Sequence, residues 1–210
     1  FDNGWRSYIS RTSAASSLES TGAMNIKAGR DVTVTASGLS AGGDAALTAA
    51  NDLNLNGVST SQNDSQGRDQ SHATGVDRTT ISSGGNLVLT AGRDLTSDAA
   101  AIVAEQDIAV QAGRDVNLLA AETGSGNSYK SGKKIEINES VRQQGTEIAS
   151  GGSTTVKAGR DVNSEAAQVT ASGDIAVGAG RDINLTTATE SDYAYKEETK
   201  TKKGFLSKKT

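Results

Sequence analysis

The tetrapeptide Ala28-Gly29-Arg30-Asp31 occurs five times in this chain of 210 residues, and an altered copy, Ala49-Ala50-Asn51-Asp52, fills a sixth position. Every copy is followed directly by Val, Leu or Ile, residues that favour β-strands. A short sequence repeated this often marks a fixed point of a repeating unit. We therefore predict a structural corner at each copy, carried by Gly29, Asp31, Gly92, Asp94, Gly113, Asp115, Gly159, Asp161, Gly180 and Asp182.

The spacing of these corners defines the repeat. A weaker version of the corner ends eight residues before each strong one, and 13 residues separate a strong corner from the next weak one in the uninterrupted stretches. Together the two distances give a unit of 21 residues. Within the unit, apolar residues alternate as in half-buried strands, for example Val32 with Val34 and Leu87 with Leu89. The pattern predicts three short strands per coil and an all-β fold, a parallel β-helix in which each coil contacts the next.

Two long gaps interrupt the repeat at the same place in the unit. The third apolar position follows its corner by eight residues at Leu39, but by 29 at Ile81 and by 33 at Ile148. We therefore expect one β-helix segment whose chain leaves the coils and returns, and both ends lie in such excursions, which predicts a longer parent protein. The expected coils are 18–56, 81–121 and 148–185, and the excursions are 1–17, 57–80, 122–147 and 186–210.

Composition supports a thin solenoid and excludes several functions. Hydrophobic residues make up only 34% of the chain, and all seven aromatic residues lie outside the predicted coils. There is no Cys to form a disulfide and no apolar run long enough to span a membrane. The net charge of −4 argues against a nucleic-acid-binding surface.

The corner motif predicts a structural role. We expect Gly to adopt a left-handed conformation, Asp to accept hydrogen bonds from backbone N–H groups, and Arg to lie beside acidic residues of adjacent coils. The motif does not follow the Gly-Gly-x-Gly-x-Asp pattern of calcium-binding repeats. The single His72 has no Cys or clustered carboxylates near it in sequence, and the acids recur at corners instead of gathering in pairs. We predict no catalytic, cofactor or metal site.

The excursions carry the individual features of the chain. The second contains Tyr129 and a run of lysines followed by alternating Ile135 and Ile137, which predicts a hairpin. The last ends in a lysine-rich stretch around a Phe-Leu pair, which either touches an anionic membrane or forms a solvated hairpin arm. The candidate membrane or partner contacts are Tyr129, Lys133, Lys134, Lys202, Lys203, Phe205 and Leu206.

These motifs resemble the haemagglutinin repeats of large bacterial exoproteins secreted by the two-partner route. That group includes filamentous haemagglutinin and the CdiA-type effectors of contact-dependent growth inhibition, whose second repeat region the lysine-rich excursions resemble most. The resemblance covers essentially the whole chain. The matching pieces are Ala-Gly-Arg-Asp-Val at 28–32, 112–116 and 158–162, Ala-Gly-Arg-Asp-Ile at 179–183, Gly-Gly-Asn-Leu at 84–87, and the segments 143–148 and 202–207.

The resemblance implies a right-handed β-helix that is exported through an outer-membrane secretion partner and exposed at the bacterial surface. In the growth-inhibition effectors, such a segment is expected to help a C-terminal toxin cross the outer membrane of the target cell. The alternative is an adhesin shaft that spaces or presents sites for a surface receptor or glycan. The two hypotheses differ in whether the segment must engage a membrane.

Overall fold

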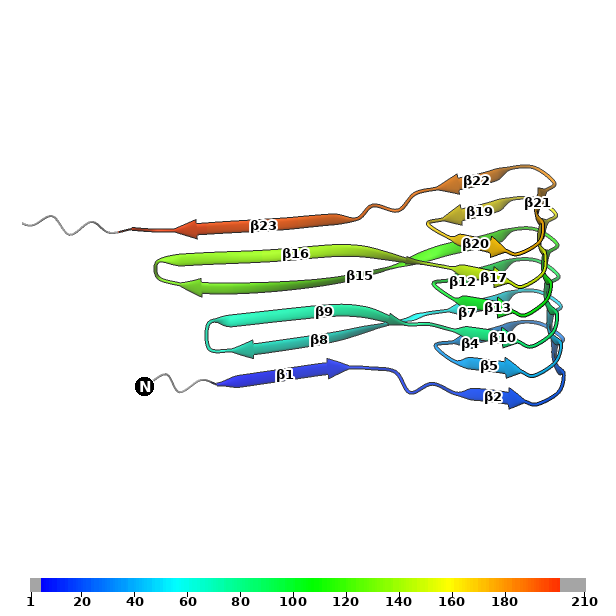
Figure 1. Ribbon diagram of the computed structural model, residues 1–210, viewed down its shortest axis with the longest axis horizontal. Coiled ribbons are helices and arrows are strands. Elements are labelled where there is room, and N and C mark those ends of the chain that lie inside the picture. Colours follow the sequence, from blue (N-terminus) through cyan, green and yellow to red (C-terminus); the bar gives the residue numbers. More distant parts are fainter. Residues whose placement is uncertain (1–4, 201–210) are drawn as a thin grey trace, which may run out of the picture.

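The fold is built entirely from short parallel strands and a lateral antiparallel extension. The structure, a computed structural model, describes residues 5–200, and all of its regular elements are β-strands. Eighteen of the strands form three parallel stacks of six, one strand from each coil in each stack (Figure 1). This arrangement is consistent with the predicted parallel β-helix, and it places consecutive coils directly against each other.

The bounds of the stacked strands follow the predicted alternation closely. The first stack holds β2 (Ser17–Ser20), β5 (Gly38–Ala41), β10 (Thr80–Ser83), β13 (Ala101–Ala104), β17 (Glu147–Ser150) and β20 (Gln168–Ala171). The second holds β3 (Met24–Ala28), β6 (Ala45–Ala49), β11 (Leu87–Ala91), β14 (Ile108–Ala112), β18 (Thr154–Ala158) and β21 (Ile175–Ala179). The third holds β4 (Val32–Thr35), β7 (Leu53–Asn56), β12 (Leu95–Asp98), β15 (Val116–Ser131), β19 (Val162–Glu165) and β22 (Ile183–Thr186).

The strand register places the residues that the spacing predicts side by side. In the first stack, the apolar position runs from coil to coil through Leu18, Leu39, Ile81, Ile102, Ile148 and Val169. Ile81 and Ile148 therefore occupy their expected places although long excursions precede them.

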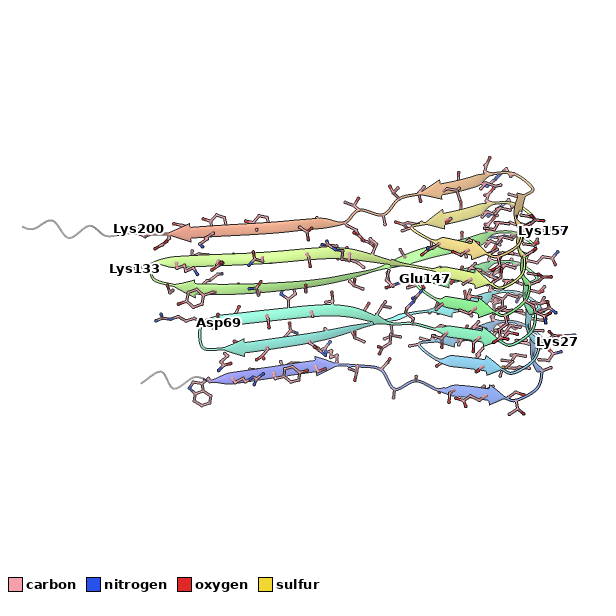
Figure 2. The ribbon with its side chains drawn as sticks, in the orientation of Figure 1. Lys27, Asp69, Lys133, Glu147, Lys157 and Lys200 are labelled. Carbon is pink, nitrogen blue, oxygen red and sulfur yellow. The ribbon has the colours of Figure 1, made fainter. Side chains whose placement is uncertain are left out.

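A six-stranded antiparallel sheet, which we call the lateral sheet, projects from one side of the stacks (Figure 1). Its strands, in spatial order, are β1 (Arg6–Arg11), β8 (Val58–Gln66), β9 (Asp69–Asp77), the outer part of β15, β16 (Lys134–Gly145) and β23 (Ser191–Glu198). Strand β15 belongs to both regions, because its first residues pair in parallel with β12 and β19. In Figure 2, Lys133 lies at the far end of the lateral sheet, whereas Lys27 and Lys157 lie on the opposite side of the molecule.

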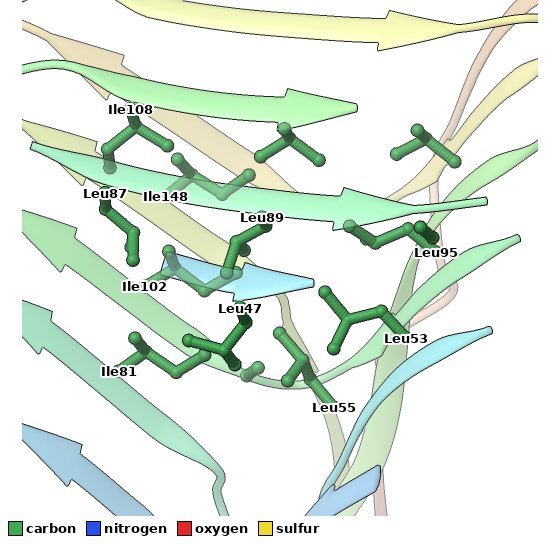
Figure 3. Close-up of a cluster of buried hydrophobic side chains, with 14 of the residues drawn as sticks. Leu47, Leu53, Leu55, Ile81, Leu87, Leu89, Leu95, Ile102, Ile108 and Ile148 are labelled. Carbon is green, nitrogen blue, oxygen red and sulfur yellow. The ribbon is translucent and has the colours of Figure 1, made fainter. Parts of the chain in front are cut away.

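The core is a narrow column of aliphatic side chains between the three stacks (Figure 3). Every second residue of each inner strand points into it, as in Leu87 and Leu89 of β11, which are both completely buried, while Val88 between them is 40% exposed. No described aromatic residue contributes to this core. Stacking thus supplies the buried apolar area that the low hydrophobic content alone would not predict.

The Gly of the corner motif differs from the prediction. Gly67, at the tip of the β8–β9 hairpin, is the only described glycine with a positive φ, so the corner glycines are not left-handed. A Cβ built on Gly113 would lie 2.1 Å from the carbonyl oxygen of Gly92, and one on Gly159 would lie 2.1 Å from that of Gly113. At these two corners successive coils approach too closely for a side chain. The altered copy carries Ala50 at the same position and keeps the backbone hydrogen bond to the preceding coil, from Ala50 N to Ala28 O at 3.1 Å, so the need for glycine differs from corner to corner.

The Asp and Arg of the motif connect one coil to the next. Asp115 Oδ1 accepts a hydrogen bond from the backbone N–H of Asp161, at 3.2 Å, and from Arg160 Nε, at 2.8 Å. Asp161 receives the same two bonds from Asp182 and Arg181. The Arg hydrogen bond is the main cause that lowers the pKa of each of these carboxyl groups. Both Asp side chains are nearly buried, and each of these two corners holds the following coil through a charge-assisted pair.

Candidate functional site

The lateral sheet is the part of the chain whose side chains are not committed to the β-helix core. It forms because hairpins leave the coils at regular intervals. Strands in a sheet lie about 4.8 Å apart, so two coils and one two-stranded hairpin each occupy about 9.6 Å. One hairpin for every two coils therefore fills the space beside the stacks, and neighbouring hairpins pair with each other, as β9 does with β15.

The β15–β16 hairpin is longer than the sequence analysis suggests. The alternating Ile135 and Ile137 predicted its outer half, but pairing extends from Ser131 and Lys134 at the tip to Ala120 and Gly145 at the base. The polar β8–β9 hairpin has no apolar alternation to reveal it, and it pairs along its whole length. The register of β8 is set by its pairing with β1 and β9, and that of β9 by its pairing with β8 and β15.

Buried threonines close the base of each complete hairpin. Thr79 Oγ1 donates to the carbonyl oxygen of Asn56, at 2.8 Å, and Thr146 Oγ1 donates to that of Leu119, at 3.1 Å. Both threonines are completely buried. Each bond joins the residue where the chain leaves the coil to the residue where it returns. The sequence analysis did not identify these two threonines. Their shared position, two residues before Ile81 and Ile148, is the sequence feature that could have indicated them.

Arg78 connects the bases of the two hairpins. Its guanidinium donates to the carbonyl oxygens of Ala99, Ala100 and Gly145 at 2.6, 3.0 and 3.2 Å, and it lies 3.2 Å from a carboxylate oxygen of Glu147. The side chain is only 21% exposed. Arg78 thus fixes the lateral sheet to the coils. No repeated motif marks this residue, so the sequence offered no signal for it.

The outer ends of the strands meet in a continuous line, which we call the rim. The rim comprises Trp5, the tip residues 66–69 and 129–134, and the end of β23 at 196–200. Backbone hydrogen bonds link its neighbours: Gly67 N to Trp5 O, Lys130 N to Arg68 O, and Thr199 N to Lys133 O, at 3.2, 3.3 and 2.8 Å. Lys133, Asp69 and Lys200 mark the rim in Figure 2.

The structure brings three of the candidate contact residues together at the rim. Lys134 Nζ lies 5.5 Å from the centre of the Tyr129 ring and 2.5 Å from a carboxylate oxygen of Glu136, and Lys133 is exposed beside it. The ion pair with Glu136 is the main cause that raises the pKa of Lys134. Trp5, which the sequence analysis did not select, is 87% exposed on the same rim. Lys202, Lys203, Phe205 and Leu206 lie outside the described residues.

The chemistry available on the described surface is hydrogen bonding, ion pairing and aromatic contact. Within residues 5–200, no three His, Cys, Asp or Glu side chains are grouped so as to hold a metal ion. His72 packs over Gly126, where a Cβ would lie 2.3 Å from its ring. No helix that could span a membrane is present in the described part of the chain.

The repeat family is identified by comparison with known sequences. A family model described as Hemagglutinin repeat matches residues 6–77, 58–139 and 128–205. The first match starts in β1 and ends with β9, and the second runs from β8 into β16, so each of these two matches covers two coils and the lateral strands on both sides. The overlapping matches together span almost the whole chain.

Individual relatives carry toxin names. The chain is 50% identical over 199 residues to a tRNA nuclease CdiA of Escherichia coli strain STEC_O31, which covers 95% of this chain and 6% of that protein. It is 41% identical to a Toxin CdiA of Escherichia coli and 37% identical to a Deoxyribonuclease CdiA of Dickeya dadantii, in both cases over 100% of this chain and 7% and 6% of the relative. No solved structure matches. The chain therefore belongs to the haemagglutinin-repeat family and corresponds to a repeat region of CdiA-type proteins.

Proposed function

We propose that this chain is a non-catalytic segment of a contact-dependent growth inhibition effector that helps a C-terminal toxin cross the outer membrane of the target cell. The parent protein is secreted to the bacterial surface through an outer-membrane partner of the two-partner type. The segment itself is a right-handed β-helix with about 21 residues per coil, the hand that parallel crossover connections prefer. The match to CdiA-type repeat regions supports this assignment, and the chain spans only 6–7% of those relatives.

The observation that carries the delivery role is the rim. The rim brings together Trp5, Tyr129, Arg68 and exposed lysines from neighbouring strands. Lys133 and Lys200 mark its position at the end of the lateral sheet that lies far from the coils (Figure 2). Tryptophan and tyrosine are enriched where proteins meet the membrane interface, and basic side chains are attracted to anionic lipid. Two complete hairpins and two single strands are joined in one sheet, so these residues act on a surface together.

An adhesin shaft is the second candidate function. It is supported by the same outward position of the hairpins, which would present them to a surface receptor or glycan on another cell. In this role the segment contributes to attachment itself, whereas in delivery it acts after attachment. The two functions are therefore separated by scoring attachment and inhibition independently.

The test uses the full-length exoprotein with the rim residues replaced as Tyr129→Ser, Lys133→Gln and Lys134→Gln. The control is Lys27→Gln with Lys157→Gln, two exposed lysines on the opposite side of the molecule (Figure 2). Each lysine near an anionic surface contributes about 1 kcal/mol, so removing two weakens binding to anionic vesicles by up to about 30-fold. Delivery predicts normal secretion and attachment with reduced inhibition for the rim variant alone. Loss of attachment in that variant supports the adhesin instead, and unchanged inhibition with unchanged vesicle binding contradicts the delivery role.

A further inference from the structure

One face of the lateral sheet carries two neighbouring rows in which the side chains of the four inner strands are short, apart from Gln62. In an antiparallel sheet, directly paired residues point to the same face, and so do residues two positions along each strand. The register therefore places two rows on one face. The first row runs Tyr8, Asp64, Ser71, Asn127, Asn138 and Ala194, and the second runs Ser10, Gln62, Ala73, Ser125, Ser140 and Asp192.

These rows form the floor of a hollow, which we call the trough. It has a volume of about 650 Å³ and is lined by residues from all six strands of the lateral sheet. The next row of the same face, toward the rim, carries the longer side chains of Arg6, Tyr129, Glu136 and Lys196. The longer side chains of this row project farther from the sheet than the short side chains beside them, which leaves the hollow between. Its volume lies within the range of ordinary ligand sites.

The floor of the trough offers neutral donors and acceptors. Asn127 and Asn138 are cross-strand partners at its centre, and each amide both donates and accepts hydrogen bonds. Serine hydroxyls flank them, and the Oγ atoms of Ser125 and Ser140 are hydrogen-bonded at 3.0 Å. Short amide and hydroxyl side chains in two rows match a ligand that itself carries many hydroxyl groups.

The two carboxylates of the floor rows, Asp64 and Asp192, are paired within the protein, and the exposed Glu139 lies at the margin of the trough. Asp64 accepts hydrogen bonds from Nε and Nη2 of Arg6, at 3.2 and 2.7 Å. Asp192 accepts one from Arg142 at 2.7 Å. A charged ligand would have to compete with these ion pairs, whereas a neutral one leaves them intact. At one edge strand, the Tyr8 ring is 57% exposed and provides an apolar surface against which a sugar ring can stack.

We propose that the trough binds a neutral oligosaccharide chain. The trough crosses all six strands, so it accepts several consecutive sugar rings. An acyl chain would leave the amide and hydroxyl groups of Asn127, Asn138 and the serines without hydrogen-bond partners. A peptide could not add a strand here because the inner strands already pair on both sides. This inference is independent of the delivery proposal and deepens the second candidate function by naming the ligand class and its site. Its test uses neither secretion nor a toxin, so its failure leaves the delivery proposal untouched.

The test is carried out on the purified 210-residue chain. The probes are an array of neutral hexose and N-acetylhexosamine oligosaccharides, sulfated oligosaccharides printed beside them, and anionic phosphatidylglycerol vesicles. The affinity for the best neutral oligosaccharide is then measured by titration calorimetry. The variant is Asn127→Ala with Asn138→Ala, and the control is Asn63→Ala with Gln70→Ala, which removes equivalent amides from the opposite face of the same sheet. Circular dichroism shows whether both variants keep the fold.

The expected result is binding to a neutral oligosaccharide that the trough variant weakens at least tenfold and the control leaves unchanged. A separate Tyr8→Ala variant, at a 57% exposed residue of the edge strand, is expected to weaken it as well and to keep the same circular dichroism spectrum. The proposal is overturned if no neutral oligosaccharide binds, if the control loses as much affinity as the trough variant, or if the chain binds only sulfated oligosaccharides or vesicles, which would place binding at the cationic rim.

Discussion

The replacement Gly113→Ala tests why the corner motif contains glycine. A Cβ at this position would lie 2.1 Å from the carbonyl oxygen of Gly92 in the preceding coil, whereas ordinary contact begins at 3.4 Å. The two coils must therefore separate by more than 1 Å at this corner. That movement strains two backbone hydrogen bonds between the coils, Gly113 N to Ala91 O at 3.0 Å and Arg114 N to Arg93 O at 2.7 Å.

The expected loss of stability follows from these contacts. Overpacking a tight site costs about 1–3 kcal/mol, and each weakened backbone hydrogen bond contributes about 1 kcal/mol. Alanine lowers the conformational entropy of the unfolded chain, which offsets about 0.4–1 kcal/mol of this loss. We therefore expect Gly113→Ala to lower the free energy of unfolding by about 2–4 kcal/mol. The assay is urea unfolding followed by circular dichroism, with hydrogen exchange at Gly113 and Arg114 as a local measure.

Gly29→Ala is the matched control, because Gly29 occupies the same motif and has no atom within 4 Å of the added Cβ. We expect it to leave stability unchanged or raise it by up to about 1 kcal/mol, since the corner glycines do not have positive φ. If Gly29→Ala destabilises the chain as much as Gly113→Ala does, the turn conformation requires the glycine and the close-approach argument is refuted.

Three further predictions concern the core, the hairpin base and the corner charges. Leu89→Ala should lower the free energy of unfolding by about 2–5 kcal/mol in urea titration, while Val88→Ala on the exposed side of the same strand should cost less than about 1 kcal/mol; equal effects would contradict the inward alternation. Arg78→Met should lower the free energy of unfolding by about 2–4 kcal/mol and speed hydrogen exchange at the base of β16. Arg68→Met at the rim should change neither quantity. Exchange as slow in the Arg78 variant as in the unaltered chain would show that Arg78 does not fix the sheet. The pKa of Asp115 is lowered in the folded chain, so its carboxylate stabilises the fold at pH values above its ordinary pKa of 3.8. This stabilisation is lost as the pH falls through the lower pKa of the folded state, and Asp115→Asn should therefore flatten the acid side of the curve of unfolding free energy against pH. An unchanged curve would argue against the pairing with Arg160.

Much of the β-helix could be predicted because its stabilising residues repeat. The inward positions of Leu39, Ile81 and Ile148 were placed correctly across excursions of different length, since each strand must repeat the alternation of the strand beside it. The reason for the corner glycine could not be predicted from the motif. The carbonyl oxygen that excludes a side chain at Gly113 belongs to the coil beside it, and a single repeat does not show how closely the coils approach.

The lateral sheet was predicted only in part, for a different physical reason. Alternating Ile135 and Ile137 marked one hairpin, but most of its strands are polar on both faces and carry no hydrophobic period. Their association follows from the spacing of the excursions, because one hairpin for every two coils leaves no gap between them. Arg78 and the trough depend on residues from several hairpins, so neither could be recognised before the hairpins were aligned.

The most direct test of the central claim removes the hairpins from the full-length exoprotein and keeps the coils. Residues 56–80 are replaced by the sequence of the short corner at 98–101, and residues 119–147 by that at 35–38, which connect the same two stacks without an excursion. Secretion, attachment to target cells and inhibition of target cells are measured in one co-culture. If the hairpins serve delivery, secretion and attachment persist while inhibition is lost. Persistent inhibition, or loss of attachment with secretion intact, would contradict the delivery role.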